Sequence, residues 1–98
     1  MIEIDGQSFD WDEKKHEANI SRHGVSFREA ATVFLDPYVL ERYDFEHSEF
    51  EERFIAIGIS RKLNLLTVCH CFRDDGGTIR IISARKATRR EAELYGGV

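Results

Sequence analysis

Two stretches of the chain gather side chains that could act on a phosphate ester. The first, positions 47–53, reads His-Ser-Glu-Phe-Glu-Glu-Arg and sets carboxylates beside an imidazole and a guanidinium. A carboxylate and an imidazole can form a general acid–base pair, and a guanidinium can hold a phosphate. A solvated acidic loop would have the same composition, so the residues leave both interpretations open.

The second stretch, positions 78–90, contains five basic side chains and no acidic one. Arg80 lies between Ile79 and Ile81, so on a strand its side chain points away from the core. The planar donors of an arginine fixed on a sheet suit phosphate oxygens, and its charge can stabilise the negative charge that develops at phosphorus. Ordinary surface arginines beside a helix cap are the alternative interpretation.

Two helices are predicted in the N-terminal part of the chain. Asp12 is placed to cap a first helix, which Gly24 ends as its C-cap. Ser26 and Glu29 form a capping box for a second helix, and the Asp-Pro pair at 36–37 must end it. These helices provide the apolar surface against which the later strands can pack.

Beyond position 38 the hydrophobic period changes from about 3.6 to 2, as expected for strands. Strands are predicted over 38–43, 53–60, 65–72 and 78–84, and a short helix over 88–95. The segment 9–11 is a short strand or a lead-in to the first helix. The predicted fold class is α+β, with two N-terminal helices packed on a mainly antiparallel four-stranded sheet and a short C-terminal helix.

Length and composition restrict the class of protein. The 98 residues are enough for one domain over 1–98, and 42% hydrophobic and 33% charged residues exclude a disordered or collagen-like chain. The longest apolar run is the six residues 54–59, and no signal peptide is visible. We therefore expect a cytoplasmic protein with no membrane association.

The charges are divided unevenly along the chain. The net charge is −4, but residues 1–52 carry 14 acidic and 5 basic side chains, whereas residues 53–98 carry 4 acidic and 9 basic ones. This separation of acidic from basic side chains favours the interpretation that one face of the protein binds an anionic partner. The same separation also arises by chance on protein surfaces.

A metal site has little support in the sequence. Cys69 and Cys71 flank His70 in an apolar run, and on a strand both thiols point to the same face. Four-coordinate zinc needs further ligands, and the other histidines show no matching spacing. We expect two small buried cysteines, a core histidine with satisfied hydrogen bonds, and no metal or other cofactor.

Several motifs in series resemble a known family. They are Phe-Asp-Trp-Asp-Glu-Lys-Lys from Phe9, Asn19 to His23 with Gly-Val-Ser-Phe-Arg-Glu-Ala, Asp-Pro at 36–37, His47-Ser with the later Glu-Glu-Arg-Phe, and Arg80-Ile-Ile-Ser-Ala-Arg-Lys-Ala-Thr-Arg-Arg-Glu. Together they resemble BrnT, the toxin of the BrnT/BrnA type II toxin–antitoxin system, over roughly residues 9–95. The acidic stretch 41–52 and the Cys-His-Cys strand depart from the family pattern.

The resemblance implies a RelE-like fold and a metal-independent endoribonuclease that inhibits translation and arrests growth. In such toxins the 2′-hydroxyl of the RNA attacks the adjacent phosphate, and the protein orients the RNA and stabilises the charge. The resemblance also implies a BrnA-like antitoxin as partner, with operator DNA bound only through the antitoxin complex. The alternative is a non-catalytic module of the same fold that binds RNA or the antitoxin. The negative net charge favours that alternative, and the clustered arginines favour the nuclease.

The resemblance also implies roles for single residues. Arg80 and Arg85 would bind phosphate and stabilise the transition state. Glu52 is the candidate base, and Arg53 would hold the scissile phosphate or orient Glu52. The side chains expected to guide the RNA backbone are Arg73, Lys86 and Arg89, and Tyr95 is a further candidate for proton transfer.

Overall fold

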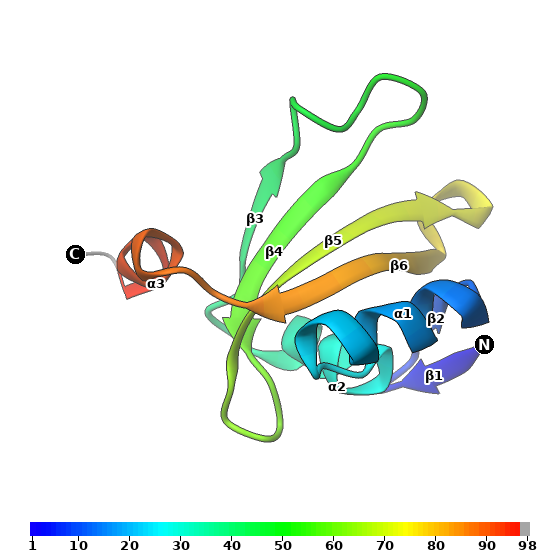
Figure 1. Ribbon diagram of the computed structural model, residues 1–98. Coiled ribbons are helices and arrows are strands. Elements are labelled where there is room, and N and C mark those ends of the chain that lie inside the picture. The colour runs from blue at the N-terminus through cyan, green and yellow to red at the C-terminus, as the bar shows by residue number, and fades with distance from the viewer. Residues whose placement is uncertain (97–98) are drawn as a thin grey trace.

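A six-stranded mixed sheet forms the centre of the molecule (Figure 1). The computed structural model describes residues 1–96. The strand order is β1-β2-β6-β5-β4-β3, in which β2 runs parallel to β6 and every other neighbouring pair is antiparallel. The strands are β1 (Ile2–Ile4), β2 (Gln7–Asp10), β3 (Leu40–Tyr43), β4 (Phe54–Ile59), β5 (Leu65–Arg73) and β6 (Thr78–Lys86).

Helices flank the sheet at two places. The helical segments within residues 1–96 are α1 (Glu13–His23), α2 (Phe27–Ala31), the 3-10 turns η1 (Thr32–Leu35) and η2 (Asp74–Gly76), and α3 (Arg89–Gly96). Figure 1 shows α1 and α2 together against one side of the sheet, with α3 apart from them beyond the end of β6. None of these helices has the length and apolar character needed to span a membrane.

The α+β class is confirmed, but the prediction of a mainly antiparallel four-stranded sheet under the two N-terminal helices is wrong. Two further strands, β1 and β2, precede the helices and form a hairpin around Asp5 and Gly6, whose φ angles are 48° and 83°. An Asp-Gly pair between apolar residues that alternate is the signal that could have predicted this hairpin. The parallel pairing of β2 with β6 joins segments about 70 residues apart, as in Phe9 with Ile79, and local periodicity carries no information about it.

The predicted caps are confirmed at the ends of the first two helices. The Asp12 carboxylate accepts hydrogen bonds from two backbone N–H groups of the first turn of α1, and Gly24 ends that helix with a φ of 70°. Ser26 Oγ accepts from the backbone N–H of Glu29 at 3.0 Å. The Glu29 side chain does not complete the capping box, because it is buried and accepts hydrogen bonds from Ser60 and Asn64 instead.

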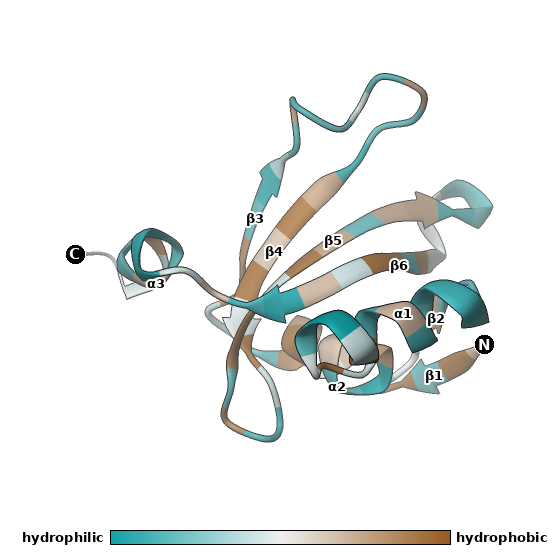
Figure 2. Ribbon diagram, in the orientation of Figure 1, coloured by the Kyte–Doolittle hydropathy of each residue, from teal (hydrophilic) through white to brown (hydrophobic). Residues whose placement is uncertain are grey.

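The core lies between the sheet and the helices α1, α2 and η1. Figure 2 shows β4 as a largely apolar strand beside the more hydrophilic β3. Residues that pack in this layer with no exposed surface include Phe9, Phe27, Ala56, Leu66 and Val68. The close approach of η1 needs Gly58, because a Cβ there would lie 2.8 Å from Cγ1 of Val33. With one face filled in this way, the other face of the sheet is left to carry polar groups.

Candidate active site

The face of the sheet turned away from α1 and α2 is here named the open face. On β5 the side chains alternate strictly, so Leu66 and Val68 enter the core while Thr67 and Cys69 lie on the open face. Cross-strand partners share a face, which places Ile55, Ile57, Ser83 and Arg85 on the open face as well.

A bulge in β6 decides which arginines reach the open face. The register with β5 passes from Cys69 opposite Ser83 to His70 opposite Ile81, so Ile82 is an extra residue without a partner. Strict alternation would place Arg80 and Arg85 on opposite faces, since they are five positions apart. The extra residue Ile82 places the side chains of both arginines on the open face. Neither arginine is therefore buried in the core.

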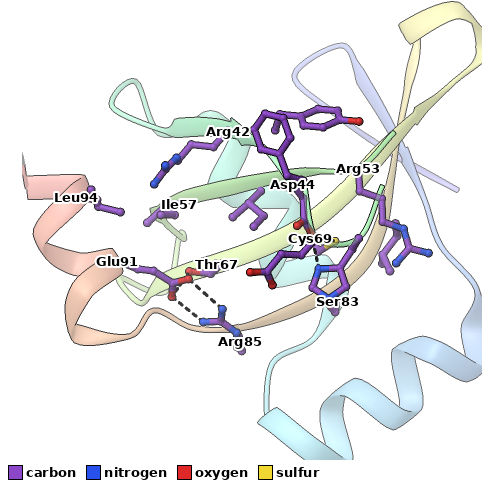
Figure 3. Close-up of a pocket in the computed structure, with 16 residues that line it drawn as sticks. Arg42, Asp44, Arg53, Ile57, Thr67, Cys69, Ser83, Arg85, Glu91 and Leu94 are labelled. Atoms are coloured by element: carbon purple, nitrogen blue, oxygen red, sulfur yellow. Dashed lines mark hydrogen bonds and ion pairs between the residues drawn. The ribbon is translucent and has the colours of Figure 1, made fainter. Parts of the chain in front are cut away.

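A cavity of about 620 Å³ occupies the open face between α3 and the loop 44–53 (Figure 3). Its floor includes Ile55 and Ile57 of β4. The charged and titratable side chains that line it come from five different parts of the chain: Arg42, Tyr43, Asp44, Glu46, His47, Arg53, Cys69, Arg85 and Glu91. Positive and negative groups are therefore mixed in one hollow.

Arg85 is held by a carboxylate from α3. Its Nη1 and Nη2 donate to the two oxygens of Glu91 at 2.7 and 3.0 Å, and Figure 3 shows this pair together with Thr67. Glu91 Oε1 also accepts from Thr67 Oγ1 at 2.9 Å and from the backbone N–H of Thr88 at 2.8 Å. The hydrogen bonds from Arg85 lower the pKa of Glu91 to about 2, so this carboxylate is ionised at neutral pH.

A second carboxylate, Glu51, lies outside the cavity lining and pairs with Arg53 of the cavity and with Arg73. Glu51 lies 3.0 Å from Nη2 of Arg73 and 3.7 Å from Nε of Arg53. The predicted base, Glu52, is exposed and lies outside the cavity lining. Glu51, the neighbouring residue, also lies outside that lining, so the assignment of Glu52 as base stays a prediction.

The other predicted site residues are spread along β6 and α3. Arg80 lies outside the cavity lining and forms an ion pair with Asp10 of β2, at 3.2 Å. Lys86 is exposed at the end of β6. Arg89 is 96% exposed and lies 4.0 Å from Glu93. The structure thus brings Arg53 and Arg85 together in the cavity and leaves the remaining predicted residues around it.

Tyr95 does not line the cavity. Its hydroxyl donates to Oδ2 of Asp36 at 2.5 Å, and this hydrogen bond raises the pKa of Tyr95 to about 12. Together with the Glu91 contacts, this bond fastens α3 to the body of the protein.

Asp44 and His47 form a pair that the sequence analysis did not assign. Asp44 Oδ2 lies 2.9 Å from Nδ1 of His47, and both residues line the cavity. His47 belongs to the first polar stretch, but Asp44 precedes that stretch. An acidic residue three positions before a histidine in a loop is a weak signal, since such spacing is common on any polar surface.

Cys71 and His70 are buried as predicted, but Cys69 is only partly buried and lines the cavity. Both thiols are free, and burial raises the pKa of Cys69 to about 11. His70 is fully buried, with ring nitrogens 3.2 Å from the Val68 carbonyl and 3.1 Å from Glu41 Oε1. Within residues 1–96, no group of three or more His, Cys, Asp or Glu side chains is arranged to hold a metal ion.

Comparisons with known proteins find a matching family model and matching solved structures. A family model described as the ribonuclease toxin BrnT of a type II toxin–antitoxin system matches residues 11–91. The crystal structure of the Brucella abortus ribonuclease toxin BrnT is similar, with a TM-score of 0.63 and 25% sequence identity, and the match covers 85% of this chain and 99% of that chain. No curated protein matches the chain.

Proposed function

The chain belongs to the BrnT family of ribonuclease toxins of type II toxin–antitoxin systems, and from this membership we propose that it is an endoribonuclease that cleaves RNA without a metal ion. In the proposed reaction the 2′-hydroxyl of the RNA attacks the adjacent phosphate and the bond to the 5′-oxygen breaks. The nucleophile belongs to the substrate, so the protein has to orient the RNA and stabilise the charge at phosphorus.

The observation that carries the proposal is the meeting of Arg53 and Arg85 in one cavity. They come from opposite sides of β5, and each presents a planar set of donors to the same hollow. Arg85 already binds the two oxygens of a carboxylate in parallel, a geometry that a phosphate can reproduce. A scissile phosphate that takes the place of the Glu91 carboxylate would therefore be held and stabilised by Arg85.

The remaining predicted residues suggest a course for the RNA. Arg80 and Arg73 lie on the open face at the end of the sheet near β2, and we assign them to the RNA backbone on one side of the cavity. Lys86 and Arg89 lie at the opposite end, where β6 leads into α3, and would contact the backbone there. The assignment of Glu52 as base stays a prediction.

The family description also bears on partners. A toxin of a type II system has an antitoxin partner, and its description as a ribonuclease makes RNA its substrate. We propose that the antitoxin is BrnA-like, that operator DNA is contacted only through the antitoxin complex, and that the protein acts in the cytoplasm to inhibit translation and arrest growth.

One observation favours a second candidate function. The arginines of the open face are engaged by carboxylates in three places: Arg85 by Glu91, Arg80 by Asp10, and Arg73 with Arg53 by Glu51. A neutralised surface of this kind is also expected of a non-catalytic module that binds RNA or an antitoxin.

Cleavage of purified RNA in excess EDTA distinguishes these functions. Antitoxin-free protein should produce ends with a 2′,3′-cyclic phosphate and a 5′-hydroxyl. If the RNA stays intact, the assay is repeated in Mg²⁺ with and without ribosomes, since excess EDTA would dissociate the ribosomes. Intact RNA in all of these assays with folded protein would leave the binding module as the function. Cleavage without ribosomes that occurs only when Mg²⁺ is restored would contradict metal independence and keep the nuclease.

A further inference from the structure

We propose that His47 is the general base that activates the 2′-hydroxyl, and that the buried Asp44 positions it. This inference rests on the proposed ribonuclease function and assigns a residue that the sequence analysis left without a role.

The pair has the geometry of an oriented imidazole. Asp44 is only 6% exposed, and its Oδ2 lies 2.9 Å from Nδ1 of His47. An ionised carboxylate can only accept a hydrogen bond, so Nδ1 carries the proton and the lone pair of the neutral ring is on Nε2. The His47 side chain is 61% exposed and lines the cavity, so a substrate bound there can reach the ring.

The loop that carries His47 is closed by hydrogen bonds at its neck. The backbone N–H of Asp44 donates to the carbonyl of Arg53 at 2.9 Å. Ser48 Oγ donates to the Asp44 carbonyl at 2.5 Å and accepts from the backbone N–H of Arg53 at 2.9 Å. These bonds fix the backbone on both sides of His47, so the imidazole is held in place without a ligand.

The charges around His47 suit a base that works beside a phosphate. The charged and titratable groups that line the cavity with His47 come from every element around it. The loop supplies Asp44, Glu46 and Arg53, β3 supplies Arg42 and Tyr43, β5 supplies the Cys69 thiol, β6 supplies Arg85, and α3 supplies Glu91. Arg53 and Arg85 can hold the phosphate in the same cavity, which leaves His47 to receive the proton. Glu52, the base predicted from the sequence, lies outside the cavity lining, whereas His47 lies within it.

The reaction balances with water as the only further reactant. Nε2 of His47 takes the 2′-hydroxyl proton while the 2′-oxygen bonds to phosphorus. The bond between phosphorus and the 5′-oxygen breaks, and its electron pair stays on that oxygen, which takes a proton from water. The imidazolium returns its proton to solvent, so the products are a 2′,3′-cyclic phosphate and a 5′-hydroxyl, and His47 is neutral again.

The test compares His47→Ala with His23→Ala, an exposed histidine at the end of α1 that does not line the cavity. The rate of 5′-hydroxyl formation is measured in excess EDTA, or in Mg²⁺ with ribosomes if the unmodified protein needs them. His47→Ala should be slower by about 100-fold or more, and added imidazole should restore part of the rate by entering the open site. His23→Ala should keep the rate and show no response to imidazole.

Two further measurements separate catalysis from folding and binding. RNA with 2′-O-methyl groups has no 2′-hydroxyl and cannot be cleaved, so its binding can be measured separately. If His47 acts only on the 2′-hydroxyl proton, His47→Ala and the unmodified protein should bind this RNA with about the same affinity. Asp44→Asn keeps the shape of the positioning residue and should lower the turnover rate more than the RNA affinity. Thermal unfolding checks that each variant is folded.

Each contrary outcome is informative. If His47→Ala cleaves as fast as the unmodified protein, the base assignment is wrong and the ribonuclease function stands. If the variant loses rate and RNA affinity by the same factor and imidazole has no effect, His47 is a binding residue and not a base. If the unmodified protein cleaves no RNA with or without ribosomes even when Mg²⁺ is present, the ribonuclease function fails and the base assignment fails with it.

Discussion

The side-chain amide of Asn19 forms hydrogen bonds with both backbone polar groups of Ala84. Its Nδ2 donates to the Ala84 carbonyl at 2.8 Å, and its Oδ1 accepts from the Ala84 N–H at 3.0 Å. These are the bonds that a neighbouring strand would supply, but β2 pairs with β6 only as far as Arg80. Asn19 therefore completes the edge of β6 directly beside Arg85 and fastens α1 to it.

Asn19→Ala should destabilise the protein by roughly 2–4 kcal/mol, because it leaves buried backbone groups of Ala84 and Val25 without partners. Urea unfolding measures the change. Glu17→Ala, at an exposed position on the same helix, should change the free energy of unfolding by less than about 0.5 kcal/mol. Equal stability of the two variants would show that the Asn19 bonds contribute nothing.

Arg85→Ala should reduce RNA cleavage by about 100-fold or more, since it removes the donors proposed to stabilise the charge at phosphorus. Arg85→Lys keeps the charge but loses the parallel donors. Its cleavage rate should therefore lie between the rate of the unmodified protein and that of Arg85→Ala. Arg22→Ala, which removes an exposed arginine of α1, is the matched control and should leave the rate unchanged. Initial rates of end formation provide the comparison, and full activity of folded Arg85→Ala would remove the assignment.

The ion pair between Glu91 and Arg85 makes stability depend on pH. The pKa of Glu91 falls from its ordinary 4.5 to about 2 on folding, so its carboxylate stabilises the folded protein above pH 4.5. This contribution is lost as the pH falls from 4.5 towards 2. Glu91→Gln should lower the unfolding temperature at pH 7 and make the unfolding temperature fall less steeply below pH 4.5.

Thermal unfolding of both proteins between pH 2 and pH 7 tests this prediction. The cost at neutral pH should be about 1–2 kcal/mol, because Arg85 is partly exposed and solvent screens the pair. Parallel pH curves for Glu91→Gln and the unmodified protein would mean that other carboxylates determine the acid sensitivity.

Gly58→Ala should destabilise the protein by about 1–3 kcal/mol, because the new Cβ would meet Val33 Cγ1 at 2.8 Å and the Val33 carbonyl at 3.2 Å. Val33→Ala removes the first of these contacts. The double variant should therefore be less destabilised than the sum of the two single variants, as a double-mutant cycle in urea would show. Strict additivity would indicate that η1 moves freely away from β4.

The sequence predicted those parts of the fold whose signals are local. A cap at Asp12 or Ser26 acts within one helical turn, and Gly24 is required by the conformation of a single residue. The alternation of side chains along β5 is also a local signal. It places Thr67 and Cys69 on one face of the strand, and this does not depend on which strands lie beside β5. Such features depend on neighbours in the chain, so they can be read without the tertiary structure.

The candidate site was only partly predictable. The sequence singled out Arg53 and Arg85, and both line the cavity. It did not identify Glu91 as the partner of Arg85, or Asp44 as the partner of His47, because these contacts depend on where α3 and the loop 44–53 fold back. Charged residues in loops have no periodic pattern that would reveal their partners.

The sequence by itself determined the family, the α+β class, the caps of the first two helices and the two polar stretches. Only the tertiary structure decided that β2 joins β6 in parallel, that the extra residue Ile82 turns Arg80 and Arg85 to the same face, and that Glu91 rather than solvent meets Arg85. The physical reason is the range of the interactions. Propensity and capping act over a few residues, whereas strand register and ion pairing are fixed by segments that meet only after the chain has folded.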